Sequence, residues 1–430
     1  MTPVPAEVGR SIKSAAVHDN RAEVLISSTS CPFQEICMEI KGFTFSAVEA
    51  AIKKPGRLDL ALIFSETPAA TAAVYTTNRV KAAPVLLSME RSAKGVSRAL
   101  VANSGNANAC TGNQGMSDAL ETTRLIAERA GVAEDLVLVA STGVIGKTLP
   151  MEKIRGAVAG LFEPSAVTDL DGLARSIMTT DTFPKVASGP GEAGGVPYTL
   201  AGVAKGAGMI MPNMATMLSF LVTDAAVDPD YLGTAFREAV DDSFNIISVD
   251  GDTSTNDTAV IMANGMAGNP TIQPGTPEAA RFEKLLRETL LSLARQIVRD
   301  GEGATKFVEL RVAGAYSNAD AKKIAMTIAN SLLVKTAFFG QDANWGRIIA
   351  AVGYAGVEID QELISLSFDD VHMVRNGVFV GGDAEERGSE VLRKSEFTVT
   401  VDLALAEGSA TVYTCDLSHD YVSINADYRT

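Results

Sequence analysis

The sequence predicts an α+β fold with α/β layers, because strand-like and helix-like segments follow one another along the whole chain. Three short apolar segments, separated by turn residues, come first. Amphipathic segments with recognisable helix starts and stops follow them. The C-terminal end is again rich in strand-like segments, which predicts a smaller α/β subdomain over residues 306–430.

The N-terminal half begins with three expected strands. They are LDLALIF (58–64), TAAVYTT (71–77) and RALVANS (98–104). The next element is a helix, SDALETTRLIAERAG (117–131), which starts at a serine and stops at a glycine. LVLVAST (136–142) then predicts a short buried strand that runs into a glycine-rich turn.

The C-terminal half opens with an expected helix over residues 228–244. A longer helix begins at Thr276–Pro277, because a capping threonine followed by a proline is a typical helix start. Its apolar residues recur every three or four positions and form one face: Phe282, Leu286, Leu290, Leu293 and Ile297. The remaining elements are strands at 306–312, 397–405 and 410–417 and a helix at 321–335.

Charge and cysteine content exclude several classes of protein. The 430-residue chain carries a formal net charge of -15, which argues against a nucleic acid or an anionic membrane as partner. Cys31, Cys37, Cys110 and Cys415 show no CxxC spacing and the histidines are scattered, so we expect neither a metal site nor a disulfide framework. Residues 1–37 lack the features of a signal or transit peptide, and we expect an N-terminal extension of a cytoplasmic protein.

An uncharged run extends from Gly206 to Thr223, about the minimum length that crosses a membrane. Gly206, Gly208, Pro212 and Asn213 interrupt its first half. A helix breaker beside a polar amide makes a poor membrane span but a good buried turn. We therefore expect no membrane segment here.

Two loops imitate ligand sites without completing them. STGVIGKT (141–148) ends like a phosphate-binding loop, but Ser141 stands where the first glycine is required. DGDTSTND (250–257) begins like a calcium loop, but Thr255 replaces the required glycine and Ile261 the final glutamate. Neither loop therefore predicts a nucleotide or a calcium site.

Thr216 lies in the middle of the uncharged stretch MIMPNMATMLSF (209–220). Composition alone favours a core threonine whose hydroxyl bonds to a backbone carbonyl. The alternative is a nucleophile whose base is its own α-amine, freed when the bond before it is cut. An α-amine has a pKa of about 7.7 to 8, which is close to operating pH. The small side chain of Ala215 leaves room for an attack on its carbonyl group.

The segment KGAGMIMPNMATMLSF resembles the self-processing segment of the ornithine acetyltransferase family, also called the glutamate N-acetyltransferase or ArgJ family. Further blocks follow the family order: GRLDLALI, TTNRVKAAPVLLS, NSGNANACTG, STGVIGK, TTDTFPK, DGDTSTNDT, GEGATK, FFGQDANWGRIIAAVG and DLSHDYVSINADYRT. The resemblance covers about residue 40 to the C-terminus. It implies an αββα-type sandwich of the DmpA/ArgJ-like kind.

The resemblance implies that the chain cuts itself. In the family the bond before the threonine of an ATML sequence is cleaved, and here that bond is Ala215–Thr216. An α chain (38–215, after the extension) and a β chain (216–430) would then remain together. The family pattern is a dimer of such pairs, a heterotetramer.

The resemblance also implies a ping-pong acetyl transfer. The Thr216 hydroxyl would take the acetyl group from N2-acetylornithine and pass it to glutamate. Thr142 and Gly143 match the family pair that stabilises the oxyanion. No metal or organic cofactor is required, and acetyl-CoA is a second donor only in bifunctional members of the family, which leaves the choice between one donor and two open.

Six positions match the substrate-binding residues of the family: Thr182, Lys205, Thr216, Glu302, Asn425 and Thr430. Lys205 would supply a fixed cation for the α-carboxylate of the substrate, although a solvated lysine at a strand end is the simpler interpretation. Thr180 competes with Thr182 for its role. Glu302 would face an amino group, or it is only an acid in a turn.

A self-cleaving aminopeptidase or amidohydrolase of related fold is the nearest alternative, because there water resolves the acyl-enzyme. The blocks around Lys205, Glu302 and INADYRT favour the transferase. A non-catalytic or nucleotide-binding protein would leave the chain uncut and would lose nothing when Thr216 is changed.

Overall fold

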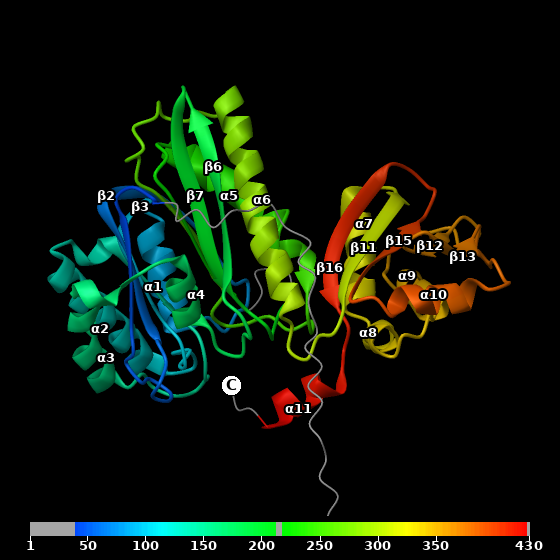
Figure 1. Cartoon of the computed structure of the whole chain (residues 1–430), viewed down its shortest axis with the longest axis horizontal. Helices are drawn as coiled ribbons and strands as arrows, with labels where there is room; N and C mark the ends of the chain where they lie inside the picture. The colour runs from blue at the N-terminus through cyan, green and yellow to red at the C-terminus, as the bar shows by residue number, and fades with distance from the viewer. Residues whose placement is uncertain (1–38, 212–216, 428–430) are drawn as a thin grey trace, which may run out of the picture. The chain divides into compact units, whose positions relative to one another are not determined.

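The computed structural model describes residues 39–211 and 217–427. Within these ranges, two β-sheets carry helices on their faces (Figure 1). The α+β layered class is therefore confirmed. The expected extension, residues 1–37, lies outside the described residues, and the division into α and β chains and a subdomain at 306–430 stays a prediction.

The first sheet is mixed and places β8 in its interior. Its strands are β1 (Phe43–Val48), β2 (Leu60–Tyr75), β3 (Val96–Asn103), β4 (Val137–Ser141), β5 (Val167–Thr168), β6 (Lys185–Ala193), β7 (Val196–Lys205), β8 (Leu218–Thr223) and β10 (Thr258–Ala263). The main order is β4-β3-β2-β10-β8-β7-β6. β8 pairs antiparallel with β7 and parallel with β10, and all of its residues are buried.

Helices cover both faces of the first sheet. α5 (Pro229–Asp241) and α6 (Pro277–Arg299) pack on one face, and α4 (Leu170–Ile177) packs on the other. Side chains of β8 alternate between these layers: Leu221 lies in the core with α5 and α6, and Phe220 in the core with α4. Three further helices, of which α1 and α2 contact β4, are α1 (Ala83–Ser92), α2 (Gly112–Ala130) and α3 (Met151–Val158).

The second sheet has its own core. Its strands, in spatial order, are β14 (Val378–Phe379), β13 (Val371–Arg375), β12 (Ser365–Phe368), β15 (Glu396–Asp402), β11 (Phe307–Ala315), β16 (Gly408–Cys415) and β9 (Ile247–Ser248). The helices that follow β11 are α7 (Asn318–Ala329), α8 (Leu332–Phe339), α9 (Trp345–Gly353), α10 (Ala384–Leu392) and α11 (His419–Asp427). α6 contacts β6 and β7 of the first sheet and also β9 and β16 of the second (Figure 1). Because β9 precedes residue 306, the second sheet takes a strand from outside the expected subdomain.

Helix ends follow the capping signals of the sequence. Thr276 accepts the Ala279 N–H at 3.1 Å and begins α6, as expected. Gly131 ends α2 in the left-handed region, with φ of 66°. The start of α2 differs from the prediction, since the helix begins at Gly112 and not at residue 117.

Two predicted elements differ in the structure. The strands expected at 58–64 and 71–77 are one long strand, β2, whose pairing with β3 is interrupted by a bulge between Phe64 and Ala69. The helix expected at 321–335 is divided into α7 and α8, because the Ser331 side chain accepts the Val334 N–H and starts a new helix.

The uncharged run contributes a strand and not a membrane helix. Its described end is β8, whose first residue, Leu218, is the Cα partner of Lys205 at the end of β7. Over residues 39–211 and 217–427, no helix is long and apolar enough to cross a bilayer.

Candidate active site

A cavity of about 280 Å³ lies where strand ends and loops of the first sheet meet α11. Five of the residues expected in the site line it: Thr142, Gly143, Lys205, Glu302 and Asn425. They come from four different places in the chain, since Thr142 and Gly143 are neighbours. The fold therefore brings together most of the expected side chains that it describes.

Thr142 follows β4 and presents its hydroxyl group to the cavity. The Thr142 N–H is donated to the Asn103 carbonyl at 2.9 Å, so the backbone of Thr142 is fixed. Lys205 Nζ donates to Thr142 Oγ1 at 3.0 Å. Because an ammonium group only donates, Thr142 Oγ1 is the acceptor and its own hydrogen remains available to donate.

Gly143 presents a backbone N–H beside this hydroxyl. No hydrogen bond within the described part of the chain uses the Gly143 N–H. Its φ is +133°, and a Cβ at this position would lie 2.3 Å from the Gly105 carbonyl carbon and 2.5 Å from the Asn106 nitrogen. Only glycine therefore fits, and the pair Thr142 and Gly143 offers two donors of the kind that stabilise an oxyanion.

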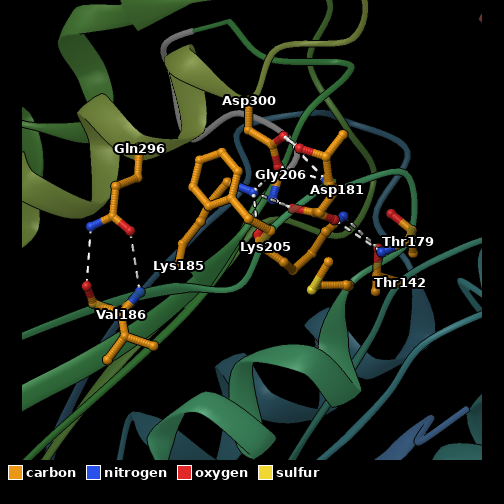
Figure 2. A network of polar contacts seen from close by, with 12 residues as sticks. Thr142, Thr179, Asp181, Lys185, Val186, Lys205, Gly206, Gln296 and Asp300 are labelled. Carbon is orange, nitrogen blue, oxygen red and sulfur yellow. Dashed lines mark hydrogen bonds and ion pairs between the residues drawn. The ribbon is translucent and has the colours of Figure 1, made fainter. Parts of the chain in front are cut away.

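A buried network of ion pairs lies beside Lys205 (Figure 2). Lys185 is fully buried and donates to Asp181 at 2.7 Å and to Asp300 at 2.5 Å. Asp181 also accepts the N–H groups of Thr179, at 2.9 Å, and Gly206, at 2.6 Å. The two carboxylates thus surround Lys185, which satisfies that cation inside the protein.

Lys205 is the cation of this network that reaches the cavity. It is 3% exposed, and burial lowers its pKa while the charge of Asp181 opposes that change. Burial would raise the pKa of Asp181, but the charges of Lys205 and Lys185 outweigh it and hold that pKa below its usual value. Thr142 is the partner of one Lys205 donor, which leaves donors for a ligand anion.

The threonines of TTDT divide between the cavity and the ion network. Thr182 donates its N–H to Asp300 at 3.0 to 3.1 Å and its hydroxyl to the same carboxylate, and it is absent from the cavity lining. Thr179 and Thr180 line the cavity. The substrate-binding role of Thr182 stays a prediction, and of the two candidates only Thr180 lines the cavity.

Carboxylates form another wall of the cavity. Glu302 is 8% exposed and accepts a hydrogen bond from Asn425 Nδ2 at 2.8 Å. A Cβ on Gly208 would lie 2.5 Å from the Glu302 carboxyl carbon, so glycine lets the carboxylate pack against the backbone there. One turn before Asn425, the Tyr421 hydroxyl donates to Asp250 at 3.3 Å. The lining of the cavity therefore includes a buried cation, Lys205, and the carboxylates of Glu302 and Asp250.

Sequence reasoning missed four lining residues of the DGDTSTND loop, Asp250, Asp252, Ser254 and Asn256, and the side chains of two of them bind the backbone of other segments. Asn256 donates to the carbonyls of Ala107, at 2.6 Å, and Ser141, at 2.9 Å, and so holds the residue before Thr142 in place. Asp250 is the second. The loop stands out in the sequence by its closely spaced oxygen side chains and as one of the family blocks, but neither feature assigns a role to its individual residues.

The loops at 141–148 and 250–257 resemble a phosphate-binding loop and a calcium loop only in sequence. In a nucleotide-binding loop the helix starts at the GK pair, but here α3 begins at Met151, after Gly146 and Lys147. The described residues contain no group of three or more His, Cys, Asp or Glu side chains arranged to hold a metal ion.

Ala215, Thr216 and Thr430 lie outside the described residues. The nearest described neighbours of the proposed cleavage point are Met211 and Met217. Met217 is 1% exposed and belongs to the core with α5 and α6. The roles assigned to Ala215, Thr216 and Thr430 therefore stay predictions.

Comparison with known proteins gives close relatives over nearly the whole chain. The model of the ArgJ family matches residues 44–430. The arginine biosynthesis bifunctional protein ArgJ of Geobacter sulfurreducens is 69% identical over 393 residues, which are 91% of this chain and 100% of that protein. The protein of the same name from Syntrophotalea carbinolica is 53% identical over 394 residues, again 91% and 100%. A crystal structure of arginine biosynthesis bifunctional protein ArgJ from Bacillus halodurans is 43% identical, with a TM-score of 0.46, and the match covers 48% of this chain and 96% of that one.

Proposed function

Because the chain belongs to the ArgJ family, as its sequence blocks indicate, we propose that it transfers the acetyl group of N2-acetylornithine to glutamate in the cyclic pathway of arginine biosynthesis. The transfer proceeds through an acetyl-Thr216 intermediate. Relatives named bifunctional proteins support acetyl-CoA as a second donor for glutamate. Cytoplasm is the proposed compartment.

One observation carries this proposal. Lys205 holds the Thr142 hydroxyl at 3.0 Å, and the Gly143 N–H beside it is without a partner among the described residues. Two preorganised donors in a partly buried cavity are what acyl transfer needs, because its tetrahedral intermediates carry a negative oxygen. Loss of one such donor typically lowers the rate by about 100-fold or more.

The chain first cleaves itself. The Thr216 hydroxyl attacks the Ala215 carbonyl carbon, the C–N bond breaks, and the nitrogen takes up the hydroxyl proton to become the Thr216 α-amine. Water then hydrolyses the resulting ester, which leaves a carboxylate on Ala215 and restores the hydroxyl.

The same hydroxyl then carries the acetyl group. It attacks the acetyl carbonyl of N2-acetylornithine, and the α-amine of Thr216 accepts the hydroxyl proton. The amine delivers this proton to the departing nitrogen of ornithine. In the second half, the neutral amine of glutamate attacks the acetyl ester, and the C–O bond to Thr216 breaks as the hydroxyl regains a proton.

The charges of the cavity support an amino-acid substrate. An α-carboxylate fits the buried ammonium group of Lys205, and an amino group fits Glu302, whose carboxylate lies beside Asn425. The exposed side chain of Asn425 and its neighbour Tyr421 place α11 at the cavity. Thr430, three residues beyond α11, is proposed as the last ligand.

The two fragments would remain associated after cleavage. β7 lies before the proposed cut and β8 after it, and the two strands pair along six consecutive positions from Leu200–Thr223 to Lys205–Leu218. β8 also pairs with β10. Separation would break both ladders of an interior strand, so α and β chains form one folded unit, which we propose to assemble as a dimer of such pairs.

Two assays test this function together. Purified protein receives N2-acetylornithine plus glutamate, and separately acetyl-CoA plus glutamate, and N-acetylglutamate is measured. Formation in the first assay is expected, and its absence would overturn the transferase. Formation in the second identifies two acetyl donors. Release of acetate without glutamate would identify a hydrolase instead.

A further inference from the structure

The loop at residues 250–257 holds the backbone before the proposed cleavage point. Asp250 accepts the N–H groups of Met209, at 2.6 Å, and Ile210, at 2.8 Å. The Ile210 carbonyl in turn accepts the Val249 N–H at 2.8 Å. Three hydrogen bonds therefore fix residues 209 and 210, just before the undescribed segment.

The other end of the same loop holds the backbone after the cleavage point. Asp257 accepts the Met217 N–H at 3.0 Å. The Met217 carbonyl accepts the Thr258 N–H at 3.1 Å, which begins the ladder between β8 and β10. Both partners are buried: Met217 is 1% exposed and Asp257 is fully buried.

Two carboxylates of one loop thus bind the described residues on both sides of positions 211–216. We propose that the 250–257 loop positions the Ala215–Thr216 bond for self-cleavage, with Asp250 and Asp257 as positioning residues on its two sides. This inference rests on the proposed function. The physical reason is that fixed ends remove much of the conformational freedom that a hydroxyl would otherwise lose when it reaches the neighbouring carbonyl.

Asp257 has a carboxyl oxygen, Oδ2, that is buried and has no partner among the described residues. Burial raises the pKa of Asp257 well above its usual value, against the smaller effects of the Met217 N–H, the charge of Lys205 and the Thr76 hydroxyl. A neutral amide has the same shape, so asparagine at this position would keep an acceptor for the Met217 N–H.

Asp250 differs, because donors surround both of its oxygens. Oδ1 accepts the N–H groups of Ile210 and Asp252, at 2.8 and 3.2 Å, and Oδ2 accepts the Met209 N–H and the Tyr421 hydroxyl. Asparagine at position 250 would replace one of these acceptor oxygens by an NH₂ group, which faces hydrogen-bond donors and cannot accept from them. The same substitution is therefore expected to be tolerated at 257 and harmful at 250.

A pulse–chase experiment on full-length chains tests this inference. The variants are Asp257→Ala, Asp257→Asn and Asp250→Asn, and conversion of the 45.1 kDa precursor is followed by denaturing electrophoresis. Cleavage is expected to slow by about tenfold in Asp257→Ala and Asp250→Asn, because each loses buried hydrogen bonds to a flanking N–H. Asp257→Asn is expected to recover a rate within about threefold of the unchanged chain.

Asp224→Asn is the matched control. Asp224 is 3% exposed and accepts the Thr199 N–H at 2.7 Å, so it is a buried carboxylate that binds backbone, as Asp257 is. It follows β8 at the end away from Met217, about 20 Å along the strand. We expect this variant to be cleaved at the unchanged rate.

Folding is checked separately in a Thr216→Ala background. There no variant can cleave, so the melting temperatures of uncut chains are compared. Slow cleavage of Asp257→Ala with a melting temperature near that of Asp224→Asn supports positioning. Cleavage of Asp257→Ala and Asp250→Asn at the rate of the control would overturn the inference while leaving self-cleavage intact. An uncut but active parent protein would instead overturn the proposed function and this inference with it.

Discussion

Lys205 Nζ donates to the Thr142 hydroxyl at 3.0 Å, and this bond joins the last residue of β7 to the residue that follows β4. Both side chains are at most 4% exposed. The bond leaves the Thr142 hydrogen and two Lys205 donors for a substrate. One contact thus connects the proposed oxyanion site with the proposed carboxylate site.

Removal of the Thr142 hydroxyl should lower the rate and not the fold. Thr142→Val keeps the shape of the side chain, and we expect kcat to fall by about 100-fold or more because an oxyanion donor is lost. Thr142→Ser keeps the hydroxyl and should retain most of the activity. Steady-state kinetics on both variants decide the point, and equal kcat values for Val and Ser would exclude Thr142 as a donor.

Gly143→Ala should disturb the same turn for a steric reason. The new Cβ would lie 2.3 Å from the Gly105 carbonyl carbon, at a φ of +133°. Gly146→Ala is the control, because Gly146 also has a positive φ, +80°, but no atom lies within 4 Å of the added Cβ. We expect the control to cost about 1 to 2 kcal/mol of unfolding free energy.

The clash at Gly143 should add about 1 to 3 kcal/mol to that cost and impair both cleavage and acetyl transfer. Chemical unfolding of both variants measures the difference. Similar stability and activity of the two variants would contradict the tight approach of Gly143 to Gly105.

Substitution of Lys185 should mainly lower stability, whereas substitution of Lys205 should mainly weaken substrate binding. Lys185→Met leaves Asp300 buried without its cation and removes one of the two cations beside Asp181, and we expect a loss of about 3 to 5 kcal/mol of unfolding free energy. Lys205→Met leaves the Lys185 pairs in place, so its main effect should be on substrate binding. We expect KM for N2-acetylornithine and for glutamate to rise in that variant by about tenfold or more.

Denaturant titration and steady-state kinetics are compared for these two lysine variants. The interpretation fails if Lys205→Met proves the less stable of the two and binds substrate normally.

Glu302→Gln should weaken binding of an amino group without loss of structure. Glutamine keeps an oxygen to accept the hydrogen bond of Asn425, but it removes the negative charge. We expect KM for the substrate whose amino group faces it to rise by about tenfold. Glu309→Gln, which affects a carboxylate paired with Arg311 on β11, is the control and should leave KM unchanged.

The buried carboxyl of Asp257 should make stability depend on pH. Burial raises its pKa in the folded state well above 3.8, so its contribution is fully present below the unfolded pKa and is lost as pH rises towards the folded pKa. Asp257→Asn, measured in a Thr216→Ala background, should therefore gain stability relative to its parent as pH rises from about 4 to 8. A stability difference that does not change with pH would show that Asp257 keeps its ordinary pKa.

Local elements were the most predictable part of the fold. Thr276 and Gly131 were recognised as helix ends because their capping interactions are made with residues a few positions away. The continuity of β2 through its bulge was not recognised, since it depends on pairing with β3 and β10. The Ser331 cap divides α7 from α8 inside a pattern that apolar spacing alone continues as one helix.

The site was predictable as a set of residues but not as a set of contacts. Thr142, Gly143, Lys205, Glu302 and Asn425, which the family blocks proposed as site residues, all line the cavity, and their roles stay predictions. The sequence left Thr180 and Thr182 as alternatives, and only Thr180 lines the cavity. Thr182 is instead bound to Asp300, which is 118 positions away along the chain, so no local pattern shows the difference.

The sequence by itself determined the layered class, the family and the identity of the proposed nucleophile Thr216, because periodicity, capping signals and ordered blocks are properties of consecutive residues. Tertiary structure alone decided that Lys185 is enclosed by carboxylates while Lys205 reaches the cavity. It also decided that a loop resembling a calcium site binds Met209, Ile210 and Met217 through Asp250 and Asp257. These facts depend on contacts between segments up to 115 positions apart, as in Lys185 and Asp300, and no local pattern of side chains encodes them.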